Sequence, residues 1–108
     1  MPEYVNTEIP VSRISETGMG FRHEGKEYFS VHFDQELRVY ENRCPHFGVR
    51  LEWMPDQFLD SSRMNILCSR HSAQFDIKTG LCHQGPCVGD SLLPVQHQVH
   101  NQQLWIKV

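Results

Sequence analysis

The sequence predicts an all-β fold, in the form of a small antiparallel barrel or sandwich. Aromatic and β-branched residues alternate with polar ones in several short segments, as they do in strands with one buried face. Turn-forming residues separate these segments, and evidence for helices is thin. Short strands joined by turns are typical of barrels and sandwiches.

Two hairpins are predicted. The first has strands at residues 27–32 (EYFSVH) and 37–41 (LRVYE), joined by the turn FDQE. The second closes the chain with two alternating segments separated by the turn HNQQ. Val95, His97 and Val99 alternate with polar residues before the turn, and Leu104, Ile106 and Val108 alternate after it.

Two shorter strands are predicted between the hairpins, at residues 65–68 (NILC) and 74–77 (QFDI). The tetrad KTGL at 78–81 is a tight turn in which Gly80 can take a positive φ. The segment 52–65 contains a proline and a polar run, so we expect at most one helical turn, around residues 56–59.

Composition narrows the class of protein. A chain of 108 residues suggests one domain, residues 1–108. The formal charge of −3 argues against a partner made of nucleic acid. The chain begins without a basic, apolar leader, and no stretch approaches about 18 consecutive apolar residues, so we expect no membrane span and a cytoplasmic location. In a reducing compartment the four cysteines favour metal or redox chemistry over structural disulfides.

Two Cys/His pairs carry the chemistry of the chain. Cys44-x-His46 is followed, after 21 intervening residues, by Cys68-x2-His71. Two thiolates and two imidazoles can hold a tetrahedral zinc ion, or a 2Fe–2S cluster in which one iron takes both Cys and the other both His. A C-x-H pair is short for a zinc site, and in extended backbone its two side chains point the same way. That arrangement suits two adjacent iron atoms.

The residues around these pairs resemble the two cluster-binding boxes of Rieske iron–sulfur proteins. CPHFG at 44–48 and CSRHSAQFD at 68–76 follow C-x-H-x-G and C-x-x-H-x-x-x-F-D, and the KTG turn and GPC at 85–87 match the family's turn and proline loop. The resemblance runs from about Glu27 to the end of the chain and is nearest to small bacterial Rieske ferredoxin-like proteins.

The resemblance implies a cofactor, a ligand set and a fold. Cys44 and Cys68 would hold the inner iron of a Rieske 2Fe–2S cluster, and His46 and His71 the outer iron. The cluster-binding loops would be residues 42–51 and 66–76, with the proline loop at 83–88. The implied fold is three stacked antiparallel sheets with the cluster-binding subdomain at one tip.

Departures from the family pattern bear on the redox potential. Ser72 stands where the family usually has Gly, and Val49 and Arg70 stand where high-potential Rieske proteins have a disulfide. Ala73 and Phe75 replace the Ser and Tyr whose hydroxyls reach the cluster in those proteins. Because hydrogen bonds to sulfur favour the reduced state, we expect a potential low in the Rieske range, about −150 mV.

Several other residues have a structural and a functional interpretation. For Cys82 and Cys87 we favour packing over a disulfide or redox switch. Trp53, Met54, Phe58 and Leu59 could form a docking patch, but a satellite core is the commoner case. We expect Phe47 at the exposed rim, Pro86 stiffening its loop, and His83, His97 and His100 on the surface. Five residues are expected to be structural: Tyr28, Val31, Val39, Trp105 and Ile106.

The expected function is a one-electron carrier. A monomeric protein would accept an electron from a flavin reductase and pass it to an oxygenase or another oxidoreductase. A redox-sensing or regulatory module with the same cluster is the alternative, and a structural zinc domain is a third reading. No nucleophile–base pair, phosphate loop or substrate domain is evident, so no catalytic residue is assigned and the protein is expected to serve an oxidoreductase system rather than catalyse alone.

Overall fold

The computed structural model describes residues 4–33, 35–45, 48, 50–51, 56–68 and 73–107. Within these ranges the chain forms nine strands and one turn of 3-10 helix, η1 (Val11–Arg13). The strands are β1 (Tyr4–Pro10), β2 (Met19–His23), β3 (Lys26–Phe33), β4 (Glu36–Glu41), β5 (Asn65–Cys68), β6 (Ala73–Asp76), β7 (Cys82–Gln84), β8 (His97–His100) and β9 (Gln103–Lys107). The predicted all-β class is confirmed. None of the described segments is a helix of the length and apolarity that a bilayer crossing requires.

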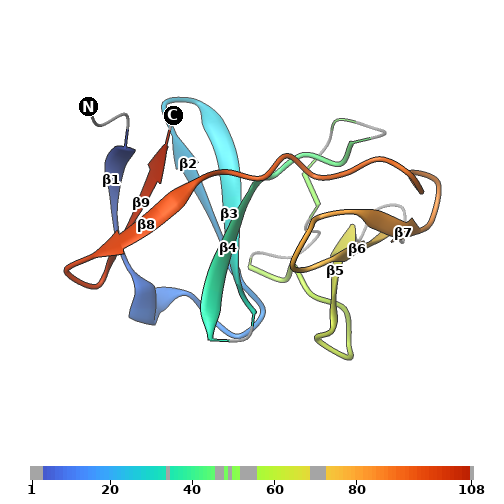
Figure 1. Cartoon of the computed structure of the whole chain (residues 1–108), viewed down its shortest axis with the longest axis horizontal. Coiled ribbons are helices and arrows are strands. Elements are labelled where there is room, and N and C mark those ends of the chain that lie inside the picture. The colour runs from blue at the N-terminus through green and yellow to red at the C-terminus, as the bar shows by residue number, and fades with distance from the viewer. Residues whose placement is uncertain are drawn as a thin grey trace.

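The strands form three antiparallel sheets of three strands each, in the orders β1-β9-β8, β2-β3-β4 and β5-β6-β7. Figure 1 shows them in a row, with β2-β3-β4 between the other two. The molecule is longest along this row, with principal extents of 38 × 25 × 22 Å. The sheet β5-β6-β7 forms one end, which we call the tip.

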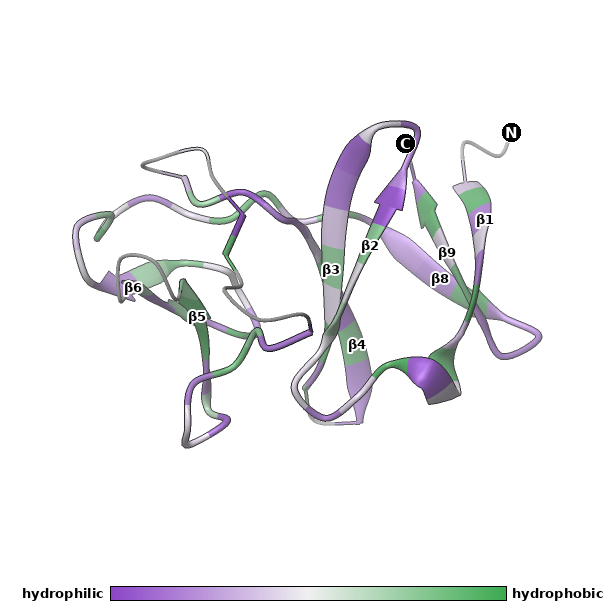
Figure 2. Cartoon of the chain, turned by 180° about the vertical axis from the view of Figure 1, so that it is seen from behind, coloured by the Kyte–Doolittle hydropathy of each residue, from purple (hydrophilic) through white to green (hydrophobic). Residues whose placement is uncertain are grey.

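The middle sheet buries side chains on both of its faces. Successive side chains of a strand point to opposite faces, so β3 supplies Phe29 and Val31 to one core and Tyr28 to the other. The first core is shared with the tip and the second with β1 and β9. Figure 2, which shows the chain from behind, has apolar bands along β3 and β4. Burial on both faces fixes the position of the hairpin relative to both neighbours.

The predicted hairpins are confirmed. Strands β3 and β4 pair over the predicted segments, with Phe29 opposite Tyr40 and Ser30 opposite Val39. Strands β8 and β9 form the closing hairpin, and β5 and β6 lie within one residue of their predicted bounds. Three strands, β1, β2 and β7, were not predicted. Strand β1 is irregular, with Glu8 at a φ of 63° and a register shift between Asn6 and Ile9, so it lacks a clear alternation.

The segment before β5 is not helical in its described part. Asp56 has a φ of 60°, and Leu59 makes an isolated bridge to Ile66. The Asp56 carboxylate accepts a hydrogen bond from the Gly20 N–H at 2.8 Å, which ties the segment to β2. Phe58 stacks on Phe29 with 4.5 Å between ring centroids. The single helical turn expected around residues 56–59 is replaced by these contacts.

Tyr40 fastens the tip to the middle sheet. Its hydroxyl donates a hydrogen bond of 2.6 Å to the Ile77 carbonyl. The turn that follows is closed by Asp76, whose Oδ1 accepts from the Lys78 and Thr79 N–H groups. Gly80 has the predicted positive φ, 79°, and a Cβ there would lie 2.8 Å from Tyr40 Cε1. The KTG turn therefore packs directly against the Tyr40 ring, where a side chain would not fit.

Replacing Tyr40 with Phe should destabilise the protein. The change removes one buried hydrogen bond and leaves the Ile77 carbonyl without this donor, so we expect the free energy of unfolding to fall by about 1–2 kcal/mol. Urea denaturation at neutral pH measures it. Tyr28→Phe, which removes a hydroxyl from the other core, is the matched variant. Equal stability of Tyr40→Phe and the native protein would contradict this role.

The same variant should change the response to alkaline pH. Burial is the main cause that raises the pKa of Tyr40 from 10.0 to about 12. The charge of Arg38 lowers this pKa, and the charge of Asp76 raises it. Because the pKa is higher in the folded state, the stabilisation is complete below pH 10 and is lost as the pH rises toward 12. The stability difference between the native protein and Tyr40→Phe should therefore shrink across that window.

Candidate metal centre

The first box lies on the loop that follows β4. Cys44 is fully buried, and its carbonyl accepts a hydrogen bond of 2.7 Å from the Gly48 N–H, which turns the loop back. The buried Asn42 side chain closes the loop, because its Oδ1 accepts from the Leu51 N–H at 2.9 Å. The Asn42 N–H in turn donates to the Glu27 carbonyl of β3. Asn42 thus anchors both ends of the first box to the middle sheet.

The second box begins at the end of a strand. Cys68 is the last residue of β5, is fully buried, and lies opposite Ala73, the first residue of β6. The pairing of β5 with β6 therefore fixes the depth of Cys68 in the tip. The predicted ligands His46 and His71 lie outside the described residues, as do Phe47, Val49, Arg70 and Ser72.

The proline loop packs on both boxes. Gly85 has a φ of 104°, and a Cβ there would lie 2.7 Å from the Ala73 Cα, so only glycine fits this approach to β6. Pro86 beside it is exposed. Cys87 is buried, and its thiol lies near enough to Cys44 for the Cys44 sulfur to help raise its pKa. The loop therefore contacts the second box through Gly85 and the first through Cys87.

Cys82 and Cys87 are both buried in the core, as the packing prediction expects, and their thiols are free in this structure. Their sulfur atoms are 2.9 Å apart, and the Cys82 thiol also donates to the Gln84 carbonyl at 3.3 Å. Burial first, and then the neighbouring sulfur atoms of Cys82 and Cys44, raise the pKa of the Cys87 thiol above its ordinary value. Cys87 is therefore held as a protonated donor.

The two positions that bear on the redox potential are buried and apolar. Ala73 and Phe75 are fully buried on β6, with Ala73 opposite Cys68 and Phe75 opposite Ile66. Neither side chain can donate a hydrogen bond to sulfur. A hydroxyl at residue 73 would stand next to the backbone that carries Cys68.

The remaining predicted residues divide between core and surface. Phe58 is fully buried and Leu59 packs on the same core, so the satellite-core prediction is confirmed for these two; Trp53 and Met54 lie outside the described residues. Of the five residues expected to be structural, four are buried: Tyr28, Val31, Val39 and Ile106. The fifth, Trp105, is half-buried.

The prediction of three surface histidines is wrong for one of them. His83 and His100 are exposed. His97 is half-buried, and its Nε2 lies 2.9 Å from the Leu37 carbonyl oxygen. The reason is that the chain entering β8 runs beside β4, where the Val95 N–H donates to the Val39 carbonyl. The imidazole joins two sheets and is not available for a second metal site.

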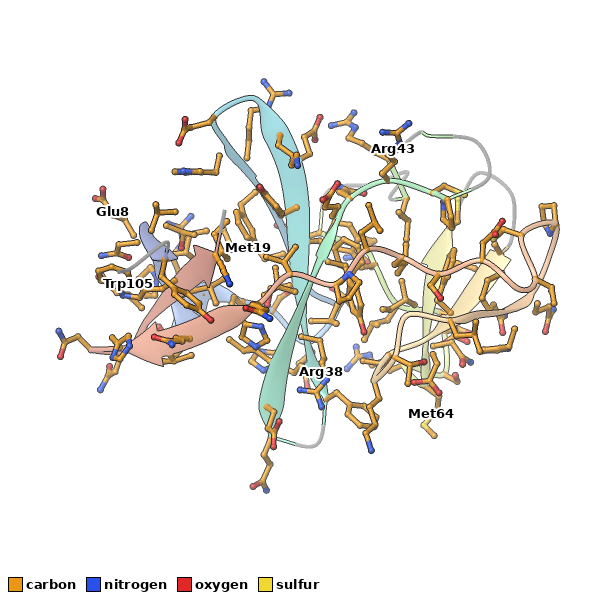
Figure 3. All side chains as sticks on the ribbon, turned by 45° about the horizontal axis from the view of Figure 1, so that its top comes forward. Glu8, Met19, Arg38, Arg43, Met64 and Trp105 are labelled. Atoms are coloured by element: carbon orange, nitrogen blue, oxygen red, sulfur yellow. The ribbon has the colours of Figure 1, made fainter. Side chains whose placement is uncertain are left out.

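Basic side chains lie beside the first box. The Arg43 guanidinium lies over Gly48, with Nε 3.5 Å from the position that a Cβ would take. Figure 3 shows Arg43 on the loop that follows β4. Arg50 lies 3.4 Å from a carboxylate oxygen of Glu27 and is about half exposed.

The described part of the site fits an iron–sulfur cluster. Cys44 and Cys68 lie fully buried in one core, on the two loops that the sequence paired. Thiolates are the soft ligands that iron–sulfur clusters take. Across the described ranges, no three His, Cys, Asp or Glu side chains gather as a metal site, and the two predicted imidazoles lie outside those ranges. The two box cysteines are therefore buried in the same core.

Solved structures share this fold. The ferredoxin of carbazole 1,9a-dioxygenase from Nocardioides aromaticivorans IC177 superposes with a TM-score of 0.75 at 20% identity, over 95% of each chain. A chain in the reduced complex between oxygenase and ferredoxin of carbazole 1,9a-dioxygenase gives a TM-score of 0.80 at 17% identity, over 96% of this chain. The terminal oxygenase of that enzyme from Novosphingobium sp. KA1 gives 0.80 at 16% identity, over 97% of this chain.

The lengths of these matches differ. The chain spans nearly the whole ferredoxin, but only 28% and 29% of the two longer chains. At such identities the likeness establishes the fold, and the expected Rieske-type stack of sheets is confirmed. No curated protein sequence is significantly similar to the chain.

A match to a family model shows which family the chain belongs to. The model described as the Rieske [2Fe-2S] domain matches residues 7–101, which is most of the chain and includes both boxes. The chain therefore belongs to the Rieske [2Fe-2S] domain family, and its cofactor is a Rieske-type 2Fe–2S cluster.

Proposed function

We propose that residues 1–108 form a single Rieske domain that carries one electron between protein partners. In this proposal Cys44 and Cys68 hold the inner iron, and His46 and His71 the outer iron. The observation that carries it is the burial of both box cysteines in one core. A cluster held there shuttles between two oxidation states that differ by one electron.

The acceptor that we propose is a Rieske-type terminal oxygenase, and the donor a flavin reductase. Support comes from the ferredoxin of carbazole 1,9a-dioxygenase, which this chain matches over 95% of both lengths. A structure of that system contains a complex between oxygenase and ferredoxin. We propose further that the protein acts as a monomer in the cytoplasm and docks transiently, as a carrier with two successive partners must.

Metal analysis tests the ligand set. The native protein, prepared without oxygen, should contain two iron atoms and acid-labile sulfide per chain, and a reduced sample should give a Rieske electron paramagnetic resonance signal. Cys44→Ala and Cys68→Ala should lose the cluster, since each removes a thiolate from the inner iron. Cys82→Ala removes a cysteine buried in the same core and should keep it. Stoichiometric zinc in place of iron would refute the assignment.

Redox titration tests the effect of the missing hydroxyls. The native midpoint potential should lie near −150 mV, at the low end of the Rieske range. Ala73→Ser or Phe75→Tyr should raise it by about 60 mV, the equivalent of roughly 1.4 kcal/mol for one electron and of one hydrogen bond to a charged group. Phe21→Tyr adds the same hydroxyl in the other core and should leave the potential unchanged. A native midpoint above about +100 mV would contradict the argument.

Electron transfer to a partner tests the function itself. Reduced protein, freed of excess reductant and mixed anaerobically with an oxidised Rieske-type oxygenase, should be reoxidised by one electron per chain, as followed by absorbance. Cys68→Ala should transfer none. A partner whose affinity depends on the oxidation state of the cluster, with no electron transferred, would instead indicate the sensory alternative.

A further inference from the structure

A second pair of sulfur atoms lies beside the site. Cys82 on β7 and Cys87 on the proline loop are each only 1% exposed. Their Sγ atoms are 2.9 Å apart, about 0.9 Å more than the ~2.04 Å of an S–S bond. Only four residues separate them in the chain, and a small rotation of both side chains would bring the sulfur atoms to bonding distance. The ligand set of the cluster uses neither thiol.

Cys87 also connects this pair to the first box. Its thiol donates to Cys82 and lies near enough to Cys44 for the Cys44 sulfur to help raise its pKa. Cys87 has one S–H hydrogen, so it can donate to only one of these sulfur atoms at a time. When Cys44 binds iron it is a thiolate, which is a stronger acceptor than the neutral Cys82 thiol. The Cys82 hydrogen is already directed to the Gln84 carbonyl.

We propose that Cys82 and Cys87 form a reversible disulfide that lowers the midpoint potential of the cluster. In the dithiol state the Cys87 S–H donates to the sulfur of Cys44 and stabilises the reduced, more negative cluster. In the disulfide state that hydrogen is gone, and the reduced cluster loses its donor. This inference rests on the proposed role of Cys44 as a ligand.

The oxidant is a low-molecular-weight disulfide such as oxidised glutathione. One thiol, as thiolate, attacks a glutathione sulfur and releases reduced glutathione. The second thiol then attacks the mixed disulfide, which forms the Cys82–Cys87 bond and releases a second reduced glutathione. Two protein thiols are oxidised and one glutathione disulfide is reduced, with the two hydrogens carried by the products.

The surrounding loop can admit such a reagent. Residues 83–86 and 88–91, which flank the two cysteines, are all exposed. Strand β7 has three residues. The loop is closed by a long hydrogen bond of 3.4 Å from the Gly89 N–H to the Cys82 carbonyl, and by two of 2.9 Å, from the Cys82 N–H to the Asp90 carbonyl and from the Asp90 N–H to the Cys87 carbonyl. Local opening of a loop of this kind takes far less free energy than unfolding.

Mass spectrometry tests whether the bond forms. Cluster-loaded protein is equilibrated in glutathione buffers with a series of redox potentials. It is then unfolded in acid, alkylated and digested with trypsin. Lys78 and Lys107 enclose a peptide, 79–107, that contains both thiols, while Cys44 and Cys68 fall in peptides 44–50 and 64–70. At oxidising poise the 79–107 peptide should become two hydrogen atoms lighter and resist alkylation, and the other two should remain alkylated. A fully alkylated 79–107 peptide at every poise would overturn the proposal.

Two variants separate bond formation from its effect on the cluster. Cys82→Ser keeps the Cys87 donor and should hold the potential of the dithiol state in every buffer. Cys87→Ala removes the donor and should hold the lower potential of the disulfide state. At a fixed ambient potential between the two midpoints, the ratio of reduced to oxidised cluster should differ about tenfold between the variants, which is about 59 mV.

The native protein should move between these two potentials as its thiols are oxidised. A disulfide that forms without moving the potential would refute the link to the cluster. The peptide masses are independent of any oxygenase, so a failure of the proposed electron transfer would leave this result standing, and the converse also holds.

Discussion

The structure depends on the burial of both faces of the β3–β4 hairpin. Because one face packs on β1 and β9 and the other on the tip, the hairpin cannot shift its register without exposing one core. Strand β4 ends directly in the first box, so the depth of Cys44 is set by the same packing. Asn42 completes this constraint by joining the end of β4 to Leu51 through a buried hydrogen bond. The middle sheet therefore positions the first box, and with it Cys44.

The tip has a core that is made partly of sulfur. Cys44, Cys68, Cys82 and Cys87 are all among its buried residues, and each comes from a different strand or loop. The hydrogen bond from Tyr40 to Ile77 and the approach of Gly85 to Ala73 draw these segments together. Two of the four thiols are assigned to iron, so binding of the cluster and ordering of the tip should be coupled, as in other small metal-binding domains.

Local patterns in the sequence predict the local structure, but they do not predict pairings between strands that are far apart in the chain. The β3–β4 and β8–β9 hairpins are contiguous, with alternation and turns that can be read directly. Strand β1 pairs with β9, at the opposite end of the chain, and β7 has three residues, too few for a period to show. The boxes identify Cys44 and Cys68 by their spacing. Nothing in a local window shows that Asn42 closes the first box or that Cys87 reaches Cys44, because both facts arise when separate loops fold together.

The contact between the Cys82 and Cys87 sulfur atoms adds to the explanation of the predicted low potential. Ala73 and Phe75 remove two hydroxyl donors, and that alone would leave the inner ligands poor in hydrogen bonds. Cys87 provides one donor from another direction, through a thiol, which is weaker than a hydroxyl but can be removed by oxidation. A hydroxyl donor raises the potential permanently. A thiol donor with another thiol 2.9 Å away raises it only while both thiols stay reduced. If the proposed disulfide forms, exchanging hydroxyls for a thiol pair gives up a high potential and makes the potential respond to the thiol–disulfide balance around the protein.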